Sequence, residues 1–94
     1  MVTLNIFELR PGTLIKVPDG TNAQTQQGHV RLSGYWKVAR VVPVNPYRSV
    51  YGLHLVPHDY PGKLEEMGRI PQMQLDATYS VKCNAKTEVM AIAA

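Results

Sequence analysis

Apolar residues come in short runs separated by turn residues, and this spacing predicts a chain built from β-strands. A short run at 14–17 lies between two turns that contain proline and glycine. The segment 29–44 is the longest stretch rich in β-branched and aromatic residues, and 49–56 follows it after a turn at 45–48. No window of eleven or more residues has a helical period. We therefore expect a mainly β protein.

Alternation along the strands predicts which side chains are buried. In the segment 49–56, Tyr51, Leu53 and Leu55 share one side of the strand. Trp36 is in phase with apolar neighbours in the preceding strand, so we expect Trp36 and Tyr51 to pack in the core.

Two positions in the long segment interrupt the alternation. Arg40 falls in the same phase as Val38 and Val42, which would point a charge into the core. A bulge at 39–40 would turn Arg40 outward and keep both flanks packed. Gly34 predicts a second bulge or bend.

The segment 18–29 is polar and shows no apolar alternation. Its glutamine, asparagine and threonine side chains cannot form a core, so we expect an exposed and mobile loop.

The last third of the chain predicts shorter elements. We expect a connection at 57–68 with one helical turn at 63–67, then a short edge strand at 69–75 that contains a proline. A strand at 78–83 and a turn at 84–87 follow, and 88–92 is expected to return as a hairpin partner.

Five or six short strands separated by frequent turns predict a small antiparallel barrel or sandwich. A Pro-Gly turn, a short strand, a long variable loop, the sequence Gly-Tyr-Trp-Lys-Val-Ala-Arg-Val, a tight hairpin and a late Ile-Pro-x-x-x-Leu follow one another over 10–76. This order resembles SH3-like and Tudor-like small barrels, and it implies a binding face beside the variable loop. We expect one domain over 1–94, with its core barrel at about 10–83 and a C-terminal strand at 88–92.

Length and charge exclude few possible functions. The 94 residues fit one domain, and the net charge is +3 with a pI near 9.2. The basic residues are spread along the chain, with a local enrichment at 31–48. That enrichment fits either a solvated face or a surface for an anionic partner.

Reactive side chains do not form a recognisable catalytic or metal-binding motif. The single cysteine, Cys83, alternates with apolar residues, so we expect a buried packing cysteine of ordinary reactivity that reacts slowly with thiol reagents. His54, His58 and Asp59 lie close in sequence, but Pro57 separates the two imidazoles and we expect no metal there. We predict no catalytic residue and no cofactor.

Aromatic and basic residues alternate between 35 and 60, a mixture that small barrels use to bind peptides or single-stranded nucleic acid. We expect a partner-binding surface formed by Tyr35, Arg40, Tyr47 and Arg48. The leading hypothesis is a non-enzymatic adaptor or accessory subunit that binds a protein. The alternatives are a nucleic-acid-binding module that uses 31–48, and a small enzyme active only as an oligomer.

The two ends of the sequence suggest location and assembly. The first residues lack a basic region and include Glu8 within an apolar stretch, so we expect no signal peptide and a cytoplasmic protein. No apolar run is long enough to span a membrane. The apolar segment 88–94 is expected to pair inside the barrel or with a second copy of the chain.

Overall fold

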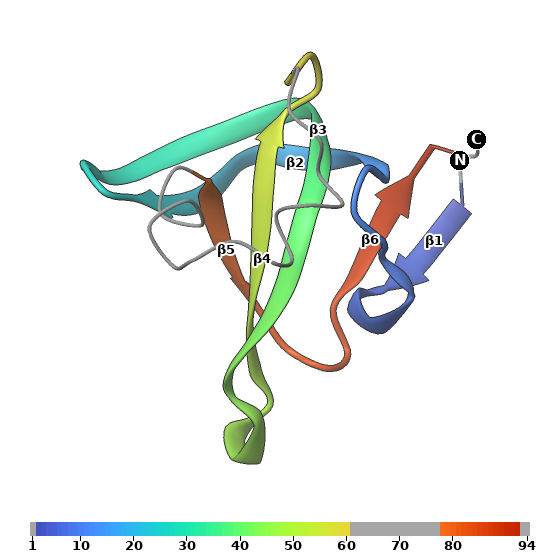
Figure 1. The fold of residues 1–94 in the computed structure, drawn as a ribbon, viewed down its shortest axis with the longest axis vertical. Coiled ribbons are helices and arrows are strands. Elements are labelled where there is room, and N and C mark those ends of the chain that lie inside the picture. The colour runs from blue at the N-terminus through green and yellow to red at the C-terminus, as the bar shows by residue number, and fades with distance from the viewer. Residues whose placement is uncertain (1, 61–77, 93–94) are drawn as a thin grey trace.

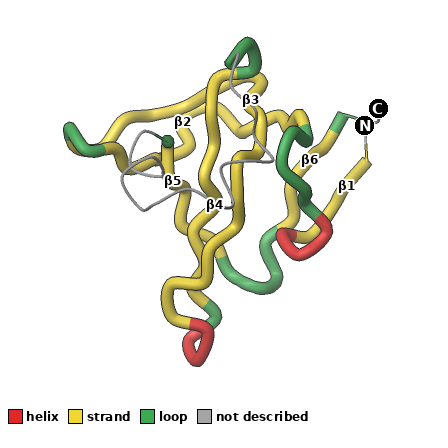
Figure 2. Tube along the Cα trace, viewed as in Figure 1, coloured by secondary structure: helices red, strands yellow, loops and turns green. Residues whose placement is uncertain are grey.

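The computed structural model describes residues 2–60 and 78–92, and most of these residues lie in strands (Figures 1 and 2). The elements in chain order are β1 (Val2–Asn5), the 3-10 helix η1 (Ile6–Glu8), β2 (Leu14–Thr25), β3 (Gly28–Asn45), the 3-10 helix η2 (Pro46–Arg48), β4 (Val50–Pro57), β5 (Tyr79–Cys83) and β6 (Glu88–Ala91). The expectation of a mainly β chain is confirmed.

The strands form one antiparallel sheet in the order β1-β6-β2-β3-β4-β5. An additional pair, Gln24 with Ser80, joins β2 to β5. The sheet therefore curves until β5 meets β2 again, as Figure 1 shows.

The expected loop at 18–29 is wrong, because 18–25 belong to β2 and 28–29 to β3, and only 26–27 form a turn. The two strands form a hairpin whose last pair is Thr25 with Gly28. The Thr25 hydroxyl donates to the Gly28 carbonyl at 3.0 Å and accepts from the Gln27 amide at 3.2 Å. Ala23 of β2 and Leu32 of β3 are buried, so a few small or apolar side chains of this mostly polar hairpin pack in the core.

The predicted bulge at 39–40 is confirmed. Val38 pairs with Leu55 and Arg40 pairs with His54, which leaves Ala39 as the extra residue. Gly34 has a φ of +83° and lies beside the register shift between β2 and β3, as expected for a bend. The turn expected at 18–20 is instead an irregularity inside β2 at that same shift.

The core lies on the inner side of the curved sheet. Its fully buried side chains include Ile15, Val38 and Leu55, and Leu53 is 3% exposed. Trp36 and Tyr51 are partly buried and pack against this cluster. The burial of 53 and 55 and the packing of Tyr51 agree with the predicted phase of β4.

The C-terminal strands contain both an agreement and a correction. The expected turn at 84–87 is present, with the Thr87 amide donating to the Asn84 carbonyl at 3.0 Å. However, β6 pairs with β1 and β2 and forms no hairpin with β5. The 88–92 segment thus pairs within its own chain. The helical turn expected at 63–67 and the strand expected at 69–75 lie outside the described residues.

The N-terminal elements β1 and η1 were not predicted. The Asn5 side chain accepts hydrogen bonds from the amides of Phe7 and Glu8, and the Glu8 carboxylate accepts one from the Asn5 amide. This reciprocal cap fixes η1, directing Ile6 into the core and leaving Phe7 outside. Within residues 2–60 and 78–92, no helix has the length and apolar character required to cross a membrane.

Candidate functional site

The four residues expected to bind a partner do not lie together. Tyr35 is in the first half of β3, opposite Lys16 of β2, and is 43% exposed. Tyr47 and Arg48 lie on η2, at the tip of the long β3–β4 hairpin seen at the bottom of Figure 1. Arg40 lies between these two places, at the bulge. We call the part of this hairpin from 40 to 54 the β3–β4 arm; it holds all of these residues except Tyr35.

The tip of the arm is held by hydrogen bonds from backbone amides to side chains. The Asn45 side chain accepts from the Arg48 amide at 3.3 Å, and Ser49 adopts a left-handed conformation with a φ of 57°. The Ser49 hydroxyl accepts from the Ala85 amide at 2.9 Å, which ties the tip to the turn after β5. Tyr47 is fully exposed and makes no ring contact among the described residues.

An apolar groove of about 460 Å³ runs along one side of the arm. Its lining is mostly aliphatic, aromatic and proline side chains, contributed by Ile6, Phe7, Leu9, Pro11, Val38, Arg40, Val41, Pro43 and Tyr51. Of the described residues that line it, only Arg40 is charged. We call this site the apolar groove.

Local structure positions the two rings of the apolar groove. The cap on η1 presents Phe7, which is 60% exposed. Its ring meets that of Tyr51 edge to face, with centroids 5.2 Å apart and planes at 88°. The groove therefore presents a pair of packed aromatic rings.

The turn at 10–13 forms another wall of the apolar groove. The Gly12 amide donates to the Val38 carbonyl at 2.7 Å, and the Val38 amide donates to the Thr13 carbonyl at 2.9 Å. Gly12 has a φ of +91°, a conformation that glycine adopts without strain. These bonds hold Pro11 against β3.

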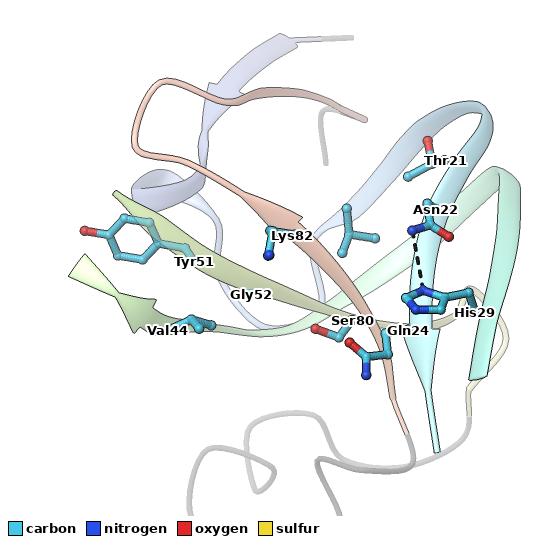
Figure 3. Close-up of a pocket in the computed structure, with 10 residues that line it drawn as sticks. Thr21, Asn22, Gln24, His29, Val44, Tyr51, Gly52, Ser80 and Lys82 are labelled. Atoms are coloured by element: carbon cyan, nitrogen blue, oxygen red, sulfur yellow. Dashed lines mark hydrogen bonds between the residues drawn. The ribbon is translucent and has the colours of Figure 1, made fainter. Parts of the chain in front are cut away.

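A second groove, of about 520 Å³, has a mixed lining that is more polar than that of the apolar groove (Figure 3). Its described lining residues are Thr21, Asn22, Gln24, His29, Val44, Tyr51, Gly52, Ser80, Val81 and Lys82. Asn22 and His29 face each other from β2 and β3, with Nδ2 and Nδ1 3.5 Å apart. Among the described residues that line this groove, Lys82 is the only lysine, arginine or acidic residue. We call this site the polar groove.

The strand register places a row of polar side chains across the sheet beside this groove. His54 pairs with Ser80, Ser80 with Gln24, and Gln24 with His29. Directly paired residues project from the same face of a sheet. The row therefore gives this face several hydrogen-bonding groups.

Gly52 forms part of the floor of the polar groove. A Cβ atom there would lie 3.4 Å from Ser80 Oγ, 3.5 Å from His54 Nε2 and 3.6 Å from Val44 Cγ2. Glycine inside a strand often marks a place where a ligand or another backbone approaches closely. His54 is oriented by Thr78, with Nδ1 and Oγ1 2.7 Å apart.

The basic residues of 31–48 are used separately. Arg31 donates from Nη1 to the Gly20 carbonyl at 3.0 Å, Arg40 lines the apolar groove, and Arg48 is at the tip of the arm. These three guanidinium groups of the described chain therefore lie at three different places and do not form one basic patch.

Cys83 is buried, as predicted, and its thiol donates to the Tyr51 carbonyl at 3.5 Å. Burial raises the pKa of this thiol, which lowers the fraction of reactive thiolate near neutral pH. Among residues 2–60 and 78–92, no group of three or more histidine, cysteine or acidic side chains is placed to hold a metal ion.

Sequence reasoning missed Phe7 and Gly52, and both had a local signal. Asn5 and Glu8 have the spacing of a capping box, which marks a helical turn that exposes Phe7. Gly52 lies inside β4, in the phase opposite to Leu53 and Leu55, and a glycine within a strand suggests a close approach.

Comparison of the chain with protein-family models, with curated proteins and with solved structures finds no match. The grooves and the residues that form them are therefore the basis for assigning a function.

Proposed function

We propose that this chain is a non-enzymatic protein-interaction module, a small barrel of SH3-like type. In this proposal, the apolar groove binds an extended segment of a partner protein. The segment carries an apolar side chain next to an acidic one.

The observation that carries the proposal is the composition of the apolar groove. A partly exposed phenylalanine, a tyrosine packed against it and two prolines offer apolar area with few rotatable bonds. Rigid aromatic residues supply contact area at low entropic cost and are enriched among residues that dominate interface energies. An apolar side chain from a partner is the complementary occupant.

Arg40 gives the groove its charge preference. No acidic side chain in the described residues forms an ion pair with it. A guanidinium group binds a carboxylate through two parallel hydrogen bonds, so an acidic residue next to the apolar side chain would complete the contact. Tyr47 and Arg48 then offer further contacts beyond the end of the groove.

The test begins with selection of binding peptides from a random displayed library, followed by titration of one selected peptide against purified variants. We expect selected peptides to share an apolar and acidic pair. Phe7→Ala should weaken binding about fivefold to thirtyfold, as for an interface aromatic whose truncation costs about 1–2 kcal/mol.

Tyr35→Ala is the matched control, because Tyr35 is a comparably exposed aromatic outside the groove. It should change the dissociation constant less than twofold. Equal losses for Phe7→Ala and Tyr35→Ala, or no loss for Phe7→Ala, would reject the apolar groove as the binding site.

A second candidate function, binding of single-stranded nucleic acid, is favoured by the polar groove. Lys82, the hydrogen-bonding amides and the Tyr51 ring offer contacts to phosphate and base. This alternative expects oligonucleotide affinity to fall steeply as salt rises and to be reduced by Lys82→Gln. Peptide binding in the apolar groove should change little with salt, because apolar burial dominates it.

A further inference from the structure

One side of β2 pairs with β3. The other side pairs with β5 and β6 at two separate places and has no strand partner between them. At one end Gln24 pairs with Ser80 of β5, and at the other Lys16 pairs with Met90 of β6. Between these pairs no strand pairing joins β2 to residues 81–89. The chain bends away through the 84–87 turn, which leaves an opening in the wall of the sheet.

This opening leads to an apolar crevice of about 470 Å³ that reaches the core. Its floor includes Ile15, Leu53 and Leu55, which are almost completely buried. Val17 from β2, Val81 from β5 and Val89 from β6 are among its other apolar lining residues. The crevice has a volume within the range of small-molecule sites.

Charged side chains line the crevice as well as apolar ones. Lys16 and Lys82 supply two positive charges, and Glu88 supplies one negative charge. Lys16 and Lys82 are exposed, so their ammonium groups can meet solvent. A ligand that suits both the apolar lining and the two lysines has an apolar body and an anionic end.

We propose that this crevice binds an unbranched alkyl carboxylate of medium chain length. The alkyl chain packs against Leu53, Leu55 and Val89, and the carboxylate lies at the rim near Lys16 and Lys82. The crevice shares none of its lining residues with the apolar groove. This third site is therefore independent of the proposed peptide binding, although it shares Thr21, Val81 and Lys82 with the polar groove.

The chain contains its own reporter for this binding. Cys83 is the single cysteine of the sequence, it lines the crevice, and it is 8% exposed. A chain in the crevice should reduce access of an alkylating reagent to its sulfur. Binding can thus be followed without adding a label.

The experiment measures the rate of Cys83 alkylation by a small maleimide at pH 8 with hexanoate, octanoate or decanoate, each below its critical micelle concentration. We expect decanoate to slow the reaction at least fivefold at saturation. The concentration for half protection should fall about fourfold for each methylene added, as expected when a methylene leaves water. Calorimetry with decanoate should give the same dissociation constant.

Charge and shape are tested separately. Nonyltrimethylammonium, which has the same nine-carbon alkyl chain as decanoate and the opposite charge, should protect at least fivefold less well. Lys16→Gln and Lys82→Gln should each weaken decanoate binding about threefold or more. Lys86→Gln is the matched control, because Lys86 is an exposed lysine of the neighbouring turn that does not line the crevice.

Two results would overturn the proposal. The first is an unchanged alkylation rate and no heat of binding with decanoate, with the fold verified by circular dichroism. The second is equal protection by decanoate and nonyltrimethylammonium, which would leave the carboxylate without a role. Either result leaves peptide binding at the apolar groove unaffected.

Discussion

The apolar groove and the polar groove share residues of the β3–β4 arm, yet their linings differ in kind. Pro43 and Tyr51, which pair across the arm, line the apolar groove. Their neighbours Val44 and Gly52 line the polar groove, which Tyr51 also reaches. Because successive side chains of a strand point to opposite faces, one hairpin can supply two surfaces of different chemistry.

The difference between the grooves teaches which interactions each can use. The apolar groove has rings, prolines and one arginine, so binding there should depend on removal of apolar surface from water. The polar groove has amides, hydroxyls and one lysine, so binding there should depend on hydrogen bonds and on salt. The following predictions separate the two surfaces.

The largest expected effect comes from the core beneath the arm. Leu55 is fully buried, so Leu55→Ala should reduce the free energy of unfolding by about 3 kcal/mol through lost burial and a cavity. Val44→Ala is the control, since Val44 is 64% exposed and should change stability by less than about 0.5 kcal/mol. Denaturant unfolding of both variants measures the effect, and similar losses would contradict the placement of the core.

A smaller effect is expected for the charge in the apolar groove. Arg40→Gln and replacement of the peptide's acidic residue by its amide should form a double-mutant cycle with a coupling energy of about 1 kcal/mol. The same cycle with Arg48→Gln should give a coupling near zero, because Arg48 lies on η2 outside the groove lining. A larger coupling for Arg48 would move the acidic contact to the tip of the arm.

Gly52→Ala should separate the functions of the two grooves without a loss of stability. The added methyl group meets its nearest atom at 3.4 Å and the glycine has no positive φ, so unfolding should change by about 0.5 kcal/mol, in the stabilising direction. Peptide affinity at the apolar groove should remain within twofold, whereas oligonucleotide affinity should fall if the polar groove binds it. Loss of peptide binding in this variant would show that the two surfaces are not separate.

The smallest effect concerns Cys83, whose thiol donates to the carbonyl of Tyr51 between the grooves. Its pKa is raised by burial in the folded state, so its contribution to stability is complete below the unfolded thiol pKa of about 8.5 and is lost as pH rises through the folded pKa. From pH 8 upward, the native protein should lose stability more steeply than Cys83→Ala. Parallel slopes in denaturant unfolding across this range would contradict the buried thiol.

Local pattern was sufficient for several parts of this fold. The phase conflict of Arg40 predicted the bulge at Ala39, and alternation in β4 predicted the burial of Leu53 and Leu55. Polarity misled the assignment of the 18–29 segment. Backbone pairing defines that ribbon, and Ala23 is among its few buried side chains.

Long-range pairing was beyond local pattern. The tight turn at 84–87 is typical of a hairpin, yet β6 takes β1 and β2 as its partners. The sequence predicted only part of the candidate site, because the site also depends on contacts between residues far apart in the chain. Arg40 stood out as a basic residue among aromatic neighbours, whereas Phe7 joins Tyr51 from a distant part of the sequence.

The most direct test of the central claim is paramagnetic relaxation in the ¹⁵N-labelled protein, caused by a selected peptide with a spin label at its apolar end. The account predicts broadened amide signals for Phe7, Leu9 and Val41, with those of Asn22, Ser80 and Lys82 retained. Broadening centred on Asn22, Ser80 and Lys82 would contradict it and assign the partner to the polar groove.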